Sequence, residues 1–144
     1  MTRHATVRAA GLMAVVAAVA VSCTVPAPFT YPLSLSAARD ATAEVQQLAG
    51  TTPMSSPAQL ATAIAATMSG VKPGCEVFVV ARVMWVAGGQ PAQAAIESRG
   101  ACDDSIGGGW YELTIVPDAQ LGWVVSAATR QDVCRRGLSG TICV

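Results

Sequence analysis

Histidine is almost absent from this sequence, since His4 is the only one among 144 residues. His4 lies in a segment that we expect to be removed, as argued below, so the mature chain has no imidazole. Without imidazole, nucleophiles of the Ser-His-Asp and Cys-His kinds are excluded, and so are zinc sites that use histidine. Because cysteine thiols pair with one another in an oxidising compartment, we also expect no cysteine-bound metal and no cofactor.

Lysine is equally scarce, and acidic residues are few. Lys72 is the only lysine, and Pro73 and Gly74 beside it indicate an exposed loop rather than a catalytic amine. The remaining enzyme class, a hydrolase with two carboxylates, needs two acids that face each other across a cleft. The sparse Asp and Glu residues show no such pairing in sequence. We therefore predict that the protein is not an enzyme.

Charge of either sign is limited, because charged residues make up 12% of the chain and balance to zero. Removing Arg3 and Arg8 with residues 1–22 leaves seven basic and nine acidic residues, a formal charge of −2. Nucleic-acid-binding domains carry a basic patch or stripe. We therefore expect no nucleic acid partner.

The sequence has no hydrophobic run long enough to cross a bilayer. Residues 10–21 are almost wholly apolar, but this run is about a dozen residues long, whereas a membrane-spanning helix needs roughly 20. Arg3 and Arg8 precede the run and no acidic residue accompanies them. A basic start followed by a short apolar region is typical of a secretory signal, so residues 1–22 are predicted to be a signal peptide.

Two cleavage sites compete at the end of this segment. The small residues at 18–20 (AVA) fit the ordinary signal peptidase. Residues 20–23 (AVSC) resemble the lipobox of bacterial lipoproteins. That resemblance implies that Cys23 becomes the first mature residue and carries fatty acyl groups such as palmitate, which anchor the protein at the outer face of the cell membrane. Residues 23–33 are then a lipidated tether, extended because of their prolines, and the alternative is a secreted, unlipidated protein.

Five cysteines leave one unpaired when the others form disulfides. Cys75, Cys102, Cys134 and Cys143 form an even set in an exported chain, so Cys23 is the odd residue, consistent with a lipid there. The four cysteines allow three pairings. Loop length favours Cys75 with Cys102 and Cys134 with Cys143, whereas closure of a small barrel would instead favour Cys75 with Cys143.

The mature chain changes in character near residue 71, although residues 34–144 are predicted to form one domain. Residues 34–70 are rich in alanine and have helical periodicity. A first helix is expected in residues 36–50, with Ser36 as its N-cap and Gly50 as its stop. A second helix is expected in residues 56–70, because Ser56, Pro57 and Gln59 form a capping box with proline at the first position.

Residues 71–144 have the composition of a β unit. The run 75–87 is dense in Val, Phe and Trp and ends at a Gly-Gly-Gln-Pro turn, which predicts a strand. Residues 110–116 and 121–127 predict a hairpin around the turn at 117–120. In the first of these strands Tyr111, Leu113 and Ile115 alternate with polar residues, so one face is expected to be buried.

This hairpin resembles part of the bacterial SH3-like domains. The resemblance rests on WYEL at 110–113, a short turn, and GWVVS at 122–126, with residues 128–133 expected as the helical turn that follows in the family. It implies a small antiparallel β-barrel and binding, without catalysis, to cell-wall peptides or peptidoglycan. Trp110, Tyr111 and Trp123 are the candidate binding residues, and Trp110 and Tyr111 must point to opposite faces of their strand.

The sequence thus predicts an α+β protein with two short helices followed by a disulfide-linked SH3-like barrel. Its predicted function is that of an envelope-anchored, non-catalytic binding module for peptidoglycan or wall peptides, with the membrane as a partner through its lipid. Two alternatives stay open. One is a protein that binds or inhibits another envelope protein, including a factor for phage superinfection exclusion, and the other is the secreted, unlipidated binder.

Overall fold

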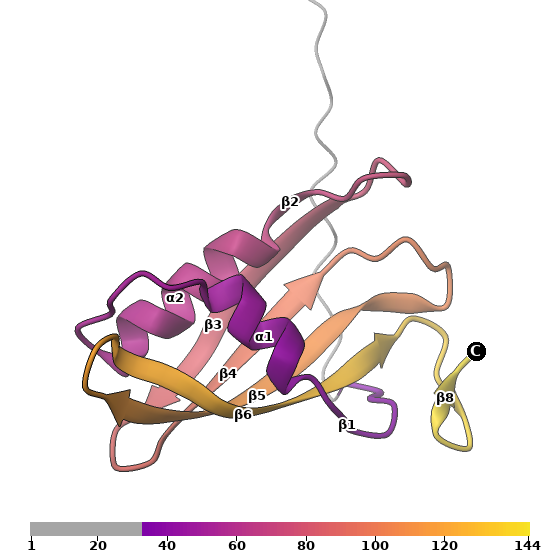
Figure 1. Ribbon diagram of the computed structural model, residues 1–144. Helices are drawn as coiled ribbons and strands as arrows, with labels where there is room; N and C mark the ends of the chain where they lie inside the picture. Colours follow the sequence, from indigo (N-terminus) through magenta and orange to yellow (C-terminus); the bar gives the residue numbers. More distant parts are fainter. Residues whose placement is uncertain (1–32) are drawn as a thin grey trace, which may run out of the picture.

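The computed structural model describes residues 33–144, which form two helices on one face of an antiparallel sheet (Figure 1). The predicted signal peptide, Cys23 and all but the last residue of the predicted tether lie outside the described residues. The main sheet has the strand order β1-β6-β5-β4-β3-β2, and a separate hairpin pairs β7 with β8. The elements are β1 (Arg39–Asp40), α1 (Thr42–Ala49), α2 (Pro57–Met68), β2 (Gly70–Val71), β3 (Phe78–Ala87), β4 (Ala92–Arg99), β5 (Ile106–Asp118), β6 (Gly122–Cys134), β7 (Leu138–Ser139) and β8 (Ile142–Cys143).

The hydrophobic core lies between the helices and the sheet. Helix α2 packs against β3 and β4, and α1 packs against β6 (Figure 1). Val45 and Ile64 from the helices are fully buried against Leu113 and Ile115 of β5. The alternation predicted for β5 is confirmed, because Tyr111, Leu113 and Ile115 are buried while Glu112 is exposed.

The second predicted helix is confirmed with its cap. The Ser56 hydroxyl accepts a hydrogen bond from the backbone N–H of Gln59 at 3.2 Å, and Pro57 occupies the first helical position. The Gln59 side chain accepts from the N–H of Ser55 at 2.7 Å, one residue before the position expected of a capping box. Together these bonds satisfy donors that a helix start leaves free.

The first predicted helix begins later than expected, so the assignment of Ser36 as its N-cap is wrong. The Ser36 hydroxyl instead accepts from the N–H of Asp132 at 2.8 Å, and the chain up to Asp40 runs along β6. Helix α1 starts at Thr42, whose N–H donates to the Asp40 carboxylate at 2.9 Å. The predicted stop is confirmed, because Gly50 follows the helix with φ of 67°.

Two parts of the sheet differ from the sequence prediction. Strand β4 (Ala92–Arg99) was not predicted, and its run AQAAIESR has few of the residues that favour strands. Residues 128–133, expected as a helical turn, continue β6 and pair with β5. In both cases pairing with a neighbouring strand overrides the local preference.

The sheet is open, and no closed barrel is found among the described residues, so the predicted SH3-like barrel is not confirmed. Its two edges are the two-residue strands β1 and β2, at opposite ends of the strand order. The buried face is covered by α1 and α2 (Figure 1). An open sheet that buries one face under helices has no need to close on itself in order to form a core.

Candidate functional site

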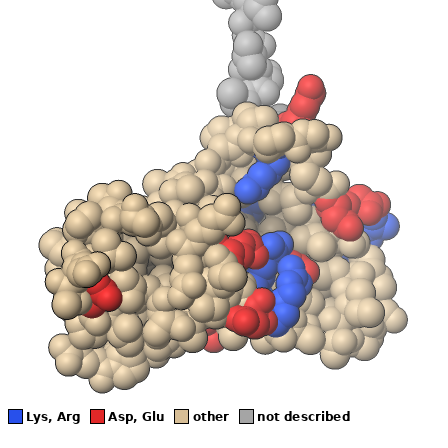
Figure 2. Space-filling view, in the orientation of Figure 1, with Lys and Arg blue, Asp and Glu red and all other residues tan. Residues whose placement is uncertain are grey.

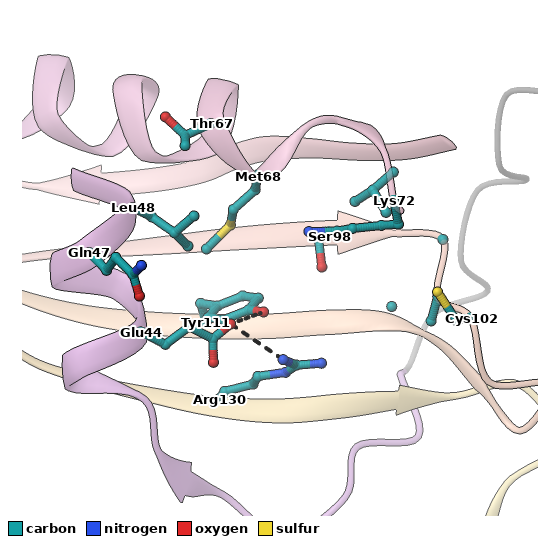
Figure 3. Close-up of a pocket in the computed structure, with 14 residues that line it drawn as sticks. Glu44, Gln47, Leu48, Thr67, Met68, Lys72, Ser98, Cys102, Tyr111 and Arg130 are labelled. Carbon is teal, nitrogen blue, oxygen red and sulfur yellow. Dashed lines mark hydrogen bonds and ion pairs between the residues drawn. The ribbon is translucent and has the colours of Figure 1, made fainter. Parts of the chain in front are cut away.

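A cavity of about 610 Å³ lies on the helix side of the sheet, beside α1 and at the C-terminal end of α2 (Figure 3). Its volume is in the range of small-molecule binding sites, roughly 300–1,000 Å³. The lining comes from both helices, four strands and the loops beside them. The residues are Glu44, Gln47, Leu48, Thr67, Met68, Lys72, Val79, Ser98, Gly100, Ala101, Cys102, Gly108, Tyr111 and Arg130.

The cavity exists because the sheet carries small residues where the helices no longer cover it. Ser98 of β4 lies opposite Gly109 of β5 in the strand register, and Gly108 lies opposite Arg99. A Cβ at Gly109 would come within 2.9 Å of the Tyr111 ring and 3.2 Å of the Ser98 hydroxyl. The glycine run therefore lets the tyrosine ring lie flat along its own strand and leaves space above it.

A network of two acids and two bases surrounds Tyr111. The Tyr111 hydroxyl donates to Glu44 Oε1 at 3.2 Å, and the guanidinium of Arg130 lies 5.4 Å from the centroid of the tyrosine ring. Arg130 also contacts Glu44 at 3.4 Å and Asp132 at 3.1 Å. Arg39 binds both oxygens of Asp132, at 2.7 Å and 3.1 Å. Figure 2 shows a group of acidic and basic side chains together near the middle of this face, with other charged side chains toward its edges.

Burial and the neighbouring charges shift the pKa values of Tyr111 and Asp132 in opposite directions. Burial raises the pKa of Tyr111 to about 12, with the positive charge of Arg130 opposing the effect and Glu44 adding to it. For Asp132, burial also disfavours the charged form, but the hydrogen bonds and charges of Arg39 and Arg130 outweigh it and lower the pKa of the carboxyl. At neutral pH the tyrosine is therefore a neutral donor, held by a carboxylate beside it.

A disulfide lies at the opposite end of the cavity. Cys75 is bonded to Cys102, which joins the β2–β3 turn to the loop between β4 and β5. Cys102 and Lys72 line this end of the cavity, away from Glu44 (Figure 3). The second disulfide joins Cys134 to Cys143 beside the β7–β8 hairpin. Both pairings are those that loop length favoured.

The three aromatic residues predicted for binding lie in three different places. Tyr111 lies in the cavity wall. Trp110 points to the other face of the sheet, because successive residues of a strand point to opposite faces. Its indole N–H donates to the carboxylate of Glu112 at 3.3 Å. Trp123 lines a smaller cavity of about 200 Å³ near the end of α1 and packs against the core. The structure thus brings only Tyr111 of the three into the larger cavity.

Glu44, Lys72 and Arg130 were not predicted as site residues. Arg130 lies directly opposite Tyr111 in the β5–β6 register, but this pairing was hidden because residues 128–133 were expected to be helical. Glu44 approaches Tyr111 only through the packing of α1 on the sheet. Lys72 was interpreted as a loop residue, and it is exposed, but the loop borders the cavity.

Metal and membrane features were also sought within residues 33–144. No group of three His, Cys, Asp or Glu side chains lies close enough there to hold a metal ion. No helix in the same range is long and apolar enough to cross a membrane. In comparisons with known proteins, no family model, curated protein or solved structure matches this chain.

Proposed function

We propose that this protein is a non-catalytic binding module, held at the outer face of the cell membrane by a lipid on Cys23, that takes a small ligand into the Tyr111 cavity. The observation that carries the proposal is the cavity itself, with its volume of about 610 Å³ and its mixed lining. Leu48, Met68 and Val79 offer apolar contact, while Glu44 and Arg130 offer charge. A few polar groups within an apolar pocket are typical of ligand sites.

The chemistry of the lining supports binding rather than hydrolysis. Glu44 is the only carboxylate among the described residues that line the cavity, whereas a two-carboxylate mechanism needs a second acid across the cleft. Glu44 is also engaged by the Tyr111 hydroxyl and by Arg130. Because the carboxylate of Glu44 is already engaged in this way, the lining favours the binding of a ligand over the activation of water.

Wall peptides are the first ligand class that we propose. The lipobox-like signal would place the cavity next to the cell wall, and short peptides combine apolar side chains with polar backbone groups that suit the lining. The resemblance of residues 110–126 to SH3-like domains favours the same class. In this proposal the ligand lies in the helix-side cavity rather than in the groove of a closed barrel.

The test is calorimetric titration of the mature protein with purified soluble muropeptides. Ala101 lies on the loop that lines the cavity, so Ala101→Trp places a large ring in the site without removing a core residue. Ala119→Trp, in the exposed β5–β6 turn, is the matched control. We expect wild type and Ala119→Trp to bind alike and Ala101→Trp to lose at least tenfold in affinity. Equal binding by all three would exclude the cavity as the site.

The alternative, a protein that binds or inhibits another envelope protein, is favoured by one feature. Within residues 33–144 the outer edge of β3 is paired with β2 only at Phe78 and Val79, and Trp85 farther along the strand is 44% exposed. An open strand edge can accept a strand from a partner. Cross-linking in cells from a photoreactive residue at position 85 should then capture one specific protein, whereas the muropeptide module predicts none.

A further inference from the structure

Among the described residues, all the charged side chains around the cavity have a partner of opposite charge, except that of Lys72. Arg39 and Arg130 are paired with Glu44 and Asp132, so these two cations and two anions neutralise each other. Lys72 lines the same cavity, and within the described part of the chain no carboxylate lies within 4.0 Å of its ammonium group. The cavity therefore carries one uncompensated positive charge, at the end where the disulfide lies.

The hydroxyl groups of the cavity are already engaged. The Tyr111 hydroxyl donates to Glu44 at 3.2 Å, and the Thr67 hydroxyl donates to the carbonyl of Ala63 at 3.0 Å. The Ser98 hydroxyl accepts from the N–H of Gly109 at 3.0 Å. Within residues 33–144, Lys72 is thus the strongest hydrogen-bond donor of the lining that is not already engaged by a neighbouring residue.

The backbone at Lys72 is fixed although its side chain is exposed. Its N–H donates to the carbonyl of Val77 at 2.9 Å across the β2–β3 turn. The disulfide from Cys75 to Cys102 joins the same turn to the opposite wall of the cavity. A fixed backbone at this position reduces the loop entropy that is lost when the lysine pairs with a ligand.

We propose that the ligand carries a single carboxylate, which pairs with Lys72 at the disulfide end while its apolar part lies against Leu48 and Met68. This inference rests on the proposed function, because it names the ligand chemistry of the same cavity. A lysine ammonium is a compact point charge that pairs with an anion without demanding a planar, two-point geometry. The carboxylate could belong to a peptide end or to a fatty acid, and the test distinguishes these two sources.

The test compares acids with their neutral amides. The probes are acetyl-alanyl-alanine and its C-terminal amide for the peptide source, and octanoate and octanamide for the acyl source, titrated into the mature protein at low and high salt. The variants are Lys72→Gln and, as a control that removes the same charge, Arg136→Gln. Arg136 is 61% exposed, pairs with Asp104 and does not line the cavity.

We expect wild type to bind the acid of one pair about tenfold more tightly than its amide, a difference of about 1.4 kcal/mol. The preference should weaken with salt, disappear in Lys72→Gln and persist in Arg136→Gln. Equal binding of acid and amide by wild type, or a preference that survives in Lys72→Gln, would overturn the inference and leave the proposed function intact. If neither probe pair binds and muropeptides do not bind either, both proposals fall.

Discussion

Tyr111 belongs both to the hydrophobic core and to the wall of the cavity. Its ring is 5% exposed and lies over Gly109, while its hydroxyl reaches the carboxylate of Glu44. Arg130 lies against the same ring and pairs with the same carboxylate. A substitution that removes the hydroxyl of Tyr111 and keeps its ring therefore alters the charge network but leaves the core filled.

The raised pKa of Tyr111 makes stability depend on pH in the alkaline range. The value in the folded protein is about 12 against an ordinary 10.0, so the unfolded chain loses this proton first. The contribution to stability is complete below pH 10 and is lost as pH rises toward 12. We expect Tyr111→Phe to lack this decrease, and to lose about 1 kcal/mol at pH 8 with its hydrogen bond.

Denaturant unfolding of both proteins at intervals from pH 8 to 12 measures the effect. An absorbance titration of tyrosinate provides the independent check, since subtraction of the Tyr111→Phe curve isolates one group. A measured pKa near 10 for Tyr111 would mean that its hydroxyl is exposed to water and would contradict this prediction.

The sequence predicts which way Tyr111 points but not what it contacts. Strand alternation alone places it on the buried face with Leu113 and Ile115. Its partners come from α1 and β6, at sequence distances of 67 and 19 residues from Tyr111. No periodicity links residues so far apart, because only the strand order and the packing of the helix bring them together.

At the scale of elements, the sequence predicts helix ends correctly where a residue caps or stops the helix beside it. Ser56, Pro57 and Gly50 mark helix ends as expected, because capping depends on the neighbouring three or four residues. The same kind of reasoning misses β4 and the end of β6. Their sequences are weak strand formers, and the ladder of hydrogen bonds from adjacent strands determines their conformation.

Gly122 links the β5–β6 hairpin to the loop that precedes α2. Its φ is +74°, and a Cβ there would collide with the backbone oxygen of Met54. The N–H of Met54 donates to the carbonyl of Leu121 at 2.8 Å, which holds the two segments together. We expect Gly122→Ala to lower the free energy of unfolding by at least about 2 kcal/mol, through a strained backbone and a steric clash.

Gly88→Ala is the matched control for this prediction, because Gly88 has open space around it and no left-handed backbone conformation. Its effect should be within about 1 kcal/mol of zero. Thermal unfolding of wild type and the two variants tests this prediction. Similar unfolding midpoints for both variants would show that the contact between hairpin and loop contributes little to stability.

At the scale of the whole molecule, the two disulfides differ in what they hold together. The bond between Cys75 and Cys102 spans 27 residues and lies beside the cavity, while that between Cys134 and Cys143 spans nine and lies at the β7–β8 hairpin. Loop entropy assigns about 3–4 kcal/mol to the first and about 2–3 kcal/mol to the second. Both are a large part of the net stability of a domain this size.

Serine replacement of each pair separates stability from binding. We expect the Cys75→Ser, Cys102→Ser variant to lose stability and also muropeptide affinity, because the turn that carries Lys72 is released. The Cys134→Ser, Cys143→Ser variant should lose stability but keep its affinity. Denaturant unfolding and calorimetry on the same samples give both quantities, and an unchanged affinity in the first variant would mean that the cavity holds its shape without the bond.

The disulfide beside the cavity can form only where the two cysteines are oxidised. A newly made chain in a reducing compartment has separate thiols at Cys75 and Cys102, so the turn that carries Lys72 is not yet joined to the opposite wall. If the chain is exported as proposed, we expect the finished site to form only after these two thiols are oxidised outside the cytoplasm. In the proposed envelope protein, oxidation therefore acts as the maturation step, and the precursor passes through the cell without capturing its ligand on the way.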